Sequence, residues 1–259
     1  MNDPAGHDLS RYDAVLFDLD GVLTRTADLH AAAWKQLFDE FLQARAARLG
    51  VPFVRFDIGD DYRLYVDGKP RHEGVKSFLE SRGITLSLGT PGDGPDKETV
   101  YGLGNRKDRY FDSQLRDKGV VVYPSTVRFL SLAKARGLMT AVVSSSHHAQ
   151  EVLESAGLTP FFEARIDGYE IDRLHLNGKP APDSFLEAAR RLGVSPQRSV
   201  VIEDALSGVQ AGRAGGFGLV IGVNRRDQAE ALRHMGADVV VTDLEELLPT
   251  DHHTEVHGP

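Results

Sequence analysis

The segment FDLDGVLTRTADLH at residues 17–30 places two aspartates directly after a short apolar run. Asp18 and Asp20 follow the sequence AVLF at 14–17, which is typical of a buried strand, and Gly21 comes next. The end of a core strand is a low-dielectric environment, where a charge is unfavourable unless it is paired or binds a metal ion. We therefore expect a positively charged partner at the end of this strand.

The composition excludes several classes of protein. The chain has 259 residues and no cysteine, so disulfides, thiolate metal sites and cysteine nucleophiles are absent. Its formal net charge of −8 makes nucleic acid and anionic membranes poor partners. It contains no apolar stretch of transmembrane length, and its first ten residues lack the pattern of a signal peptide. We expect a cytoplasmic monomer with no nucleic-acid or membrane partner.

Short apolar runs alternate with helical patterns along most of the chain. Because these runs are continuous rather than alternating, they indicate strands buried on both faces, as in a parallel sheet covered by helices. The predicted strands are 13–18, 139–144, 199–203, 218–222 and 238–241, and the predicted helices are 125–136, 147–156, 182–192, 205–214 and 226–235. This alternation predicts an α/β fold with a Rossmann-like, doubly wound parallel sheet.

One long segment after the first strand breaks the alternation. It contains no comparable apolar run and instead favours helices at 28–49, 71–82 and 105–117. We predict a helical cap domain, residues 28–118, inserted into a catalytic core formed by residues 1–27 and 119–259. The polar ends, 1–11 and 251–259, are expected to be frayed.

Further polar groups follow the other predicted strands. In open α/β sheets ligands bind beyond the carboxyl ends of the strands, so Asp18 and Asp20 should meet Glu203 and Asp204 there. Four converging carboxylates need a cation, and an all-oxygen site without histidine or cysteine suits Mg²⁺. Asp20 need not bind the metal through its side chain, because its backbone carbonyl can serve.

The same edge of the sheet contains groups that suit a phosphate. The serines at 144–146, including Ser144 and Ser145, stand at a helix start, where hydroxyl and N–H groups can hold an anion. Lys179 adds a positive charge just before another predicted helix. Beside such a phosphate, Asp18 is placed as a nucleophile, and Asp20 as a general acid and base.

Four separated motifs resemble the haloacid dehalogenase superfamily of phosphotransferases, in the order of that family. They are FDLDGVLT at 17–24, VVSSS at 142–146, GKPAPDSF at 178–185 and VIEDALSGVQAG at 201–212. The resemblance implies that Asp18 becomes an aspartyl-phosphate and that Asp20 is the acid and base. It also implies that Ser144 and Lys179 hold phosphate, that Glu203 and Asp204 help to bind Mg²⁺, and that the inserted segment is the family's helical cap.

Motifs in the inserted segment are similar to the β-phosphoglucomutase-like subgroup. They are DGKPR at 67–71, GNRKD at 104–108, and a T-x₃-H-x₃-W pattern formed by Thr26, His30 and Trp34. The similarity implies that a cap arginine, Arg71, holds a distal phosphate, that Gly68 and Lys107 contact the substrate, and that His30 senses cap closure. Two positions depart from the subgroup: Arg25 stands where an acidic residue is usual, and Asp67 where a lysine can occur.

The expected function is a Mg²⁺-dependent phosphotransferase acting on a small phosphorylated sugar. The favoured reaction interconverts β-D-glucose 1-phosphate and glucose 6-phosphate through a 1,6-bisphosphate. A sugar-phosphate phosphatase on the same scaffold is the first alternative, since water exclusion by the closed cap decides between them. A non-enzymatic receiver-type phospho-acceptor is the second alternative, although such a module needs neither a large cap nor a second aspartate two residues after the first. Some of these residues can also have a purely structural role instead of a functional one; for Trp34 that role is packing.

Overall fold

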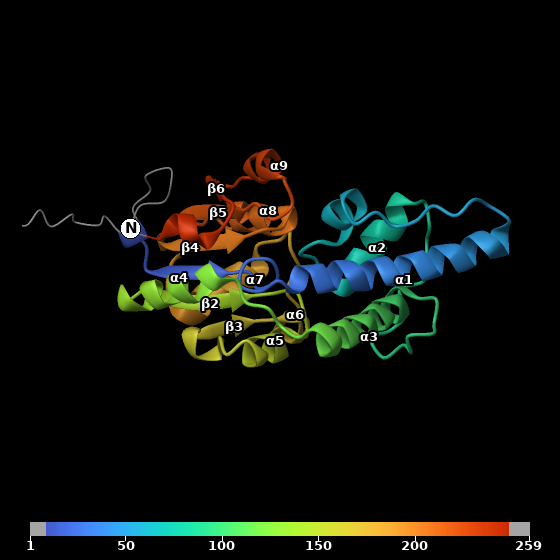
Figure 1. The fold of residues 1–259 in the computed structure, drawn as a ribbon, viewed down its shortest axis with the longest axis horizontal. Helices are drawn as coiled ribbons and strands as arrows, with labels where there is room; N and C mark the ends of the chain where they lie inside the picture. The colour runs from blue at the N-terminus through green and yellow to red at the C-terminus, as the bar shows by residue number, and fades with distance from the viewer. Residues whose placement is uncertain (1–8, 249–259) are drawn as a thin grey trace, which may run out of the picture.

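The computed structural model describes residues 9–248, and its centre is a parallel sheet (Figure 1). Within the described residues the sheet has six strands in the order β3-β2-β1-β4-β5-β6. Their bounds are β1 (Ala14–Phe17), β2 (Met139–Val143), β3 (Ala164–Ile166), β4 (Ser199–Glu203), β5 (Leu219–Val223) and β6 (Val239–Val241). Every neighbouring pair is parallel, and Leu16 on β1 lies between Ala141 and Val201. The predicted α/β doubly wound fold is confirmed.

Helices cover both faces of the sheet, which explains the continuous apolar runs. Alternate residues of a strand point to opposite faces, so Val15 and Phe17 pack with Phe129, whereas Leu16 packs with Phe185. The helices of the core, taken over both faces, are α4 (Pro124–Ala135), α5 (Ala149–Ser155), α6 (Gly168–Leu174), α7 (Asp183–Leu192), α8 (Leu206–Ala214) and α9 (Ala229–His234). All four strand residues of β1 are fully buried, so its carboxyl end lies deep in the molecule.

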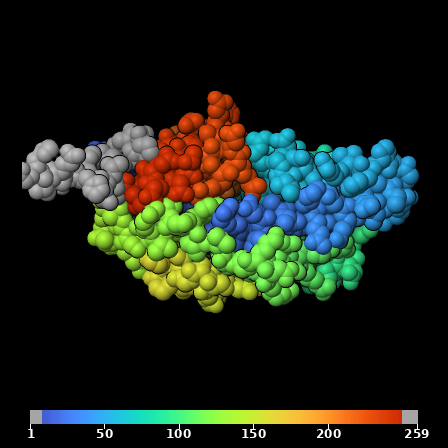
Figure 2. Space-filling view, in the orientation of Figure 1, coloured from blue at the N-terminus to red at the C-terminus, as the bar shows by residue number. Residues whose placement is uncertain are grey.

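The helical segment extends from one end of the sheet, to the right in Figure 1 and Figure 2. It consists of α1 (Thr26–Leu49), a π-helical stretch η2 (Tyr62–Val66), α2 (Arg71–Ser81) and α3 (Val100–Lys118). These elements enclose a hydrophobic cluster of their own, in which the rings of Phe38 and Phe78 lie 4.1 Å apart between centroids. We keep the name cap for residues 28–118.

Two chain passages connect the cap to the sheet side by side. The Arg25 N–H donates to the Val121 carbonyl at 2.8 Å, and the Tyr123 N–H donates to the Leu23 carbonyl at 3.2 Å. The side chain of Arg25 is exposed and lines a cavity of about 380 Å³ together with Arg225. The unusual positive charge at position 25 therefore lies at the hinge, outside the site described below.

Several sequence-based boundaries were wrong for local reasons. The strand β3 is only three residues long and was not predicted, and neither was α6 behind it. Helix α3 begins at Val100 rather than 105, because Thr99 caps it and the helix accommodates Gly102. Residues 9–11 form a 3₁₀ turn with Leu9 buried, so they are not frayed; the remainder of the two predicted frayed ends lies outside the described residues. Within 9–248, no helix is long and apolar enough to cross a membrane.

Candidate active site

Asp18 is paired with a buried lysine at the end of β1. The Lys179 ammonium donates to Asp18 Oδ1 at 2.6 Å, to Glu203 Oε1 at 2.7 Å and to the Val143 carbonyl at 3.2 Å. Burial raises the pKa of Asp18 well above its usual value, and Lys179 opposes that shift. Burial alone would lower the pKa of Lys179, but Asp18 and Glu203 raise it, so the lysine stays charged. Lys179 is thus one positive partner of the carboxylates at the end of β1.

Three carboxylates form a cluster that fits a hard metal ion. Asp18, Glu203 and Asp204 each offer an oxygen, and these oxygens lie within 4.8 Å of one another. Burial and then the charge of Asp67 raise the pKa of Asp204, so negative charge is uncompensated at this point. The backbone of Gly21 lies so close to the Asp204 carboxylate that a Cβ at this position would be 2.0 Å from Asp204 Oδ2. An all-oxygen, strongly negative cluster suits Mg²⁺.

The members of this cluster differ in how free their oxygens are. Glu203 already accepts from Lys179 and, through Oε2, from the Ala205 N–H at 2.8 Å. Asp18 and Asp204 are therefore better placed to hold the ion directly, whereas Glu203 holds the lysine beside it. The Asp20 carboxylate is outside the cluster. A metal contact through the Asp20 backbone carbonyl remains a prediction.

The Asp20 carboxylate is held by groups from both the core and the cap. The Thr26 hydroxyl donates to Oδ1, Ser144 Oγ donates to Oδ2 at 3.2 Å, and His30 Nε2 lies 3.4 Å from Oδ1. Burial raises the pKa of Asp20, but His30 and Thr26 outweigh burial and bring the pKa to about 2. Asp20 is therefore ionised here, and its position depends on residues of α1.

His30 connects Asp20 to a second cation. The Lys107 ammonium donates to His30 Nδ1 at 2.7 Å, which leaves the ring hydrogen on Nε2, facing Asp20. Burial, with the charge of Lys107, lowers the pKa of His30, and Asp20 opposes that shift. His30 stacks on Phe111 at 3.9 Å, and the Lys107 nitrogen lies 5.4 Å from the centre of the Trp34 ring. Trp34 thus packs beside this pair.

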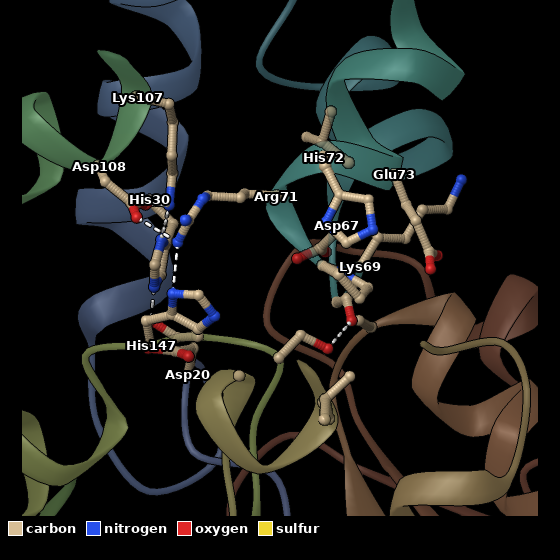
Figure 3. A pocket seen from close by; sticks show the side chains of 18 of the residues that line it. Asp20, His30, Asp67, Lys69, Arg71, His72, Glu73, Lys107, Asp108 and His147 are labelled. Carbon is tan, nitrogen blue, oxygen red and sulfur yellow. Dashed lines mark hydrogen bonds and ion pairs between the residues drawn. The ribbon is translucent and has the colours of Figure 1, made fainter. Parts of the chain in front are cut away.

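Arg71 points from the start of α2 into the same space (Figure 3). Its guanidinium donates to Asp108 Oδ2 at 2.6 Å and to Asn105 Oδ1 at 3.1 Å, and it also contacts His147 of the core. His147 in turn lies 3.0 Å from Asp172. The cap arginine therefore reaches across to the core.

A loop of the cap is seated on the core by two serines. Ser145 Oγ donates to the Gly68 carbonyl at 2.7 Å, and Ser207 Oγ donates to the Asp67 carbonyl at 2.7 Å. Gly68 has φ of +73°, and a Cβ there would lie 2.4 Å from Ser207 Oγ, so both the conformation and the close approach require glycine. Ser145 donates to this loop and also lines the cavity between cap and core, and its contact with phosphate stays a prediction.

A cavity of about 530 Å³ lies between the cap and the core. Its walls include Asp18, Asp20, Ser145 and Asp204 from the core, and His30, Trp34, Asp67, Gly68, Arg71 and Lys107 from the cap. Lys179 and Ser144 lie behind this wall and hydrogen-bond to Asp18 and Asp20, and Glu203 pairs with Lys179. The structure thus brings the predicted residues together from both parts of the chain.

Sequence reasoning missed several residues at this cavity. His147 follows the serine run directly, and this position could have indicated it. Asp172 had no such signal, because the short strand and helix that carry it were not predicted. Ser207 lies within a quoted motif, but only the contact with the Asp67 carbonyl shows its role.

Comparisons with known proteins agree with this site. Residues 12–216 match the family model described as haloacid dehalogenase-like hydrolase. A protein of Mycobacterium bovis named β-phosphoglucomutase is 55% identical over 91% of each chain. A Thermotoga maritima protein named phosphorylated carbohydrates phosphatase is 28% identical over 91% of this chain and 96% of its own. A β-phosphoglucomutase structure from Clostridium difficile has a TM-score of 0.70 at 25% identity and covers 92% of this chain and 93% of its own.

The fold and the site define an enzyme of the phosphotransferase class with a capped α/β core. The chain belongs to the haloacid dehalogenase-like hydrolase family, and within it to the β-phosphoglucomutase-like subgroup. The resemblance stated from the motifs is confirmed. The roles of the individual residues remain predictions.

The buried lysine leads to a prediction about stability. We expect Lys179→Met to lower the free energy of unfolding by about 3–5 kcal/mol, because it leaves Asp18 and Glu203 buried without their cation. Equilibrium urea unfolding in the presence of a chelator measures this loss. Lys76→Met, which removes an exposed lysine 3.9 Å from Glu80, should change stability by less than about 1 kcal/mol. A similarly small loss for Lys179→Met would show that the buried cluster is not held by its lysine.

Proposed function

We propose that this protein is a Mg²⁺-dependent β-phosphoglucomutase that interconverts β-D-glucose 1-phosphate and glucose 6-phosphate. The observation that carries the proposal is one cavity with Asp18 and Asp20 in the core wall and Arg71 in the cap wall. A bisphosphorylated sugar needs two phosphate positions, and these residues offer one at each side. The 55% identity to a protein named β-phosphoglucomutase supports the same reaction. We propose that it acts as a monomer in the cytoplasm.

The first half-reaction forms the aspartyl-phosphate. An oxygen of Asp18 bonds to phosphorus of the sugar bisphosphate, the bond from phosphorus to the sugar oxygen breaks, and that oxygen takes the proton that Asp20 accepted from a sugar hydroxyl when the bisphosphate was formed. In the second half-reaction the other sugar hydroxyl gives its proton to Asp20 and bonds to phosphorus, and the Asp18–phosphorus bond breaks. Asp20, with its pKa of about 2, is in the form that accepts this proton. Mg²⁺, held by Asp18 and Asp204, would offset the repulsion between carboxylate and phosphate.

The docked cap supports transfer to sugar over transfer to water. A mutase must keep water away from the aspartyl-phosphate while the bisphosphate reorients. The two serine contacts to Asp67 and Gly68 hold the cap loop against the core, and Thr26 and His30 bring α1 onto Asp20. The carboxylate of Asp20 is therefore held by the first turns of α1, through Thr26 just before the cap and His30 within it.

A sugar-phosphate phosphatase is the second candidate. One observation favours it: the Arg71 guanidinium is already paired with Asp108, which offsets the positive charge available to a second phosphate. The relative named phosphorylated carbohydrates phosphatase matches 91% of this chain, the same share as the relative named β-phosphoglucomutase. A receiver-type phospho-acceptor is less favoured, because it requires neither the cap nor the contacts that position Asp20. A coupled assay of β-glucose 1-phosphate with a trace of the 1,6-bisphosphate separates these functions: formation of glucose 6-phosphate supports the mutase, and release of inorganic phosphate supports the phosphatase.

Arg71→Ala should reduce the mutase reaction far more than the hydrolysis of p-nitrophenyl phosphate. The distal phosphate would lose a bidentate, charge-assisted hydrogen bond from the guanidinium. Such a loss costs about 2–5 kcal/mol at a desolvated site, which is roughly 30-fold to several thousand-fold in kcat/KM. A monophosphate ester does not use the second position, so its slow hydrolysis should change little. The measurement is kcat/KM for both substrates in both proteins.

Arg82→Ala is the matched control. Arg82 is also a cap arginine in an ion pair, with Asp61, and its side chain is 23% exposed against 21% for Arg71, but it does not line the cavity. It should leave both reactions nearly unchanged. Equal losses of both reactions in Arg71→Ala would mean that Arg71 supports the cap fold, and no loss in either would favour the phosphatase.

A further inference from the structure

Asp67 has a buried carboxylate oxygen that the contacts described so far leave unexplained. The residue is 7% exposed and lies in the cap loop between η2 and α2. Asp67 Oδ2 has no hydrogen-bond partner among the described residues. A buried carboxylate oxygen without a partner is strongly unfavourable. This oxygen therefore points to a partner that arrives from outside the chain.

The position of Asp67 is imposed by the core. Ser207 Oγ donates to its backbone carbonyl, and the next residue, Gly68, fits against Ser207 only because it lacks a side chain. Ser145 holds the Gly68 carbonyl from the other side. With the backbone fixed on both sides, the loop places the Asp67 side chain at the wall of the cavity (Figure 3). Asp18 and Asp204 line the same cavity.

Charges of both signs act on Asp67: Arg226 lowers its pKa, and Glu203 and Asp20 raise it. Among the neighbouring charges, Asp67 raises the pKa of Asp204 more than Glu203 or Asp18 does. The favourable neighbour is Arg226, whose guanidinium carbon lies 4.6 Å from the centre of the Tyr62 ring. Yet Asp67 is not part of the cluster whose oxygens lie within 4.8 Å of one another. It is thus adjacent to the carboxylate cluster without belonging to it.

We propose that Asp67 accepts a hydrogen bond from a water molecule bound to Mg²⁺, and that it thereby couples metal binding to docking of the cap. The inference rests on the proposed metal site of Asp18 and Asp204. Mg²⁺ keeps several of its waters in protein sites, and the hydrogens of those waters need acceptors. A carboxylate next to the ligand cluster, with one oxygen unpartnered, meets that need, and the cation offsets the repulsion between Asp67 and Asp204. Groups that bind the waters or ligands of a metal in this way tune its affinity.

The coupling has a consequence for the cap. If the metal-bound water attracts Asp67, Mg²⁺ stabilises the docked cap loop, and the docked loop raises the affinity for Mg²⁺ by the same factor. A lysine at this position, as can occur in the subgroup, would provide no acceptor. The chain would thus have a metal-dependent contact between cap and core that depends on one carboxylate.

A sugar hydroxyl is the other group that could bind Asp67 Oδ2. The position of Asp67 favours the metal-bound water, because Asp67 lines the same cavity as the carboxylates of Asp18 and Asp204, which repel it. A sugar hydroxyl would relieve none of this repulsion, whereas a cation and its waters do. The two partners differ in the experiment, since the metal is tested without any sugar.

The test is a Mg²⁺ titration of the full chain by calorimetry, with the metal alone as the probe. We expect Asp67→Asn to weaken Mg²⁺ binding by about 10–100-fold, the usual effect of losing such an indirect contact. Asp28→Asn is the matched control: it makes the same change of charge in the cap, at a side chain that is 70% exposed and lies 3.8 Å from Arg226. It should leave the affinity unchanged. Ser207→Ala, which frees the Asp67 backbone, should weaken binding in the same direction.

Hydrogen exchange of the loop at 66–70 gives a second reading. In the unaltered protein Mg²⁺ should slow this exchange, and in Asp67→Asn it should not. Equal Mg²⁺ affinity in Asp67→Asn and the unaltered protein would overturn the inference while leaving the proposed function intact, and a raised KM alone would assign Asp67 to the sugar. Absence of any Mg²⁺ binding by the unaltered protein would instead overturn the metal site of the proposed function, and the inference with it.

Discussion

Asp18→Asn should abolish the phosphotransfer reaction. An amide oxygen or nitrogen does not replace the carboxylate as the atom that bonds to phosphorus, and loss of a covalent nucleophile lowers kcat on the order of 10⁶-fold. The buried pairing with Lys179 argues that the fold tolerates the change, because the asparagine oxygen can still accept from the ammonium at 2.6 Å. The measurement is kcat for conversion of β-glucose 1-phosphate, with intact-mass detection of the phosphorylated chain.

The control for this change lies at the other end of the same strand. Asp13 directly precedes β1, and it pairs with Arg198 at 2.6 Å near the surface. Asp13→Asn makes the same chemical change without touching the cavity, so it should keep full activity. Asp18→Asn should also weaken Mg²⁺ binding, since it removes one charge of the carboxylate cluster. Substantial turnover by Asp18→Asn under excess Mg²⁺, or a phosphoryl group still attached to that variant, would refute the covalent mechanism.

Asp20→Asn should lower kcat by about 10²–10⁴-fold, the range for a positioned general acid and base. The loss should fall mainly in kcat rather than in KM, because the carboxylate contacts Thr26, His30 and Ser144 rather than filling the cavity. Steady-state kinetics with β-glucose 1-phosphate measures both constants. We expect accumulation of phosphorylated Asp18 to be slower as well, since the leaving oxygen lacks its proton donor.

Metal binding separates the roles of the two aspartates. The Asp20 carboxylate is not in the cluster formed by Asp18, Glu203 and Asp204, so Asp20→Asn should bind Mg²⁺ more tightly than Asp18→Asn does. Calorimetry on the two variants compares them directly. An equal loss of Mg²⁺ affinity in both would contradict the division into nucleophile and acid–base, and would place the Asp20 side chain on the metal.

The sequence alone was sufficient for the architecture and for most of the residues at the site. Continuous apolar runs such as AVLF at 14–17 indicate strands covered on both faces, and parallel strands bring their carboxyl ends to one edge. Asp18 and Glu203 could therefore be placed together although nearly two hundred residues separate them. The strand β3 was missed because three residues are too few to form a recognisable pattern.

Only the tertiary structure decided what each side chain contacts. Lys179 and Ser145 are both predicted to hold phosphate, and the structure adds contacts that the sequence did not indicate: Lys179 pairs with Asp18 and Glu203, and Ser145 binds the cap loop. The sequence offered no signal for the contact between Ser207 and the Asp67 carbonyl, which joins positions 140 apart. The reason is physical: burial and periodicity depend on each residue and its near neighbours, and so they can be read along the chain. A hydrogen-bond partner is selected by distance and direction between segments, and these exist only after the sheet and the cap have come together.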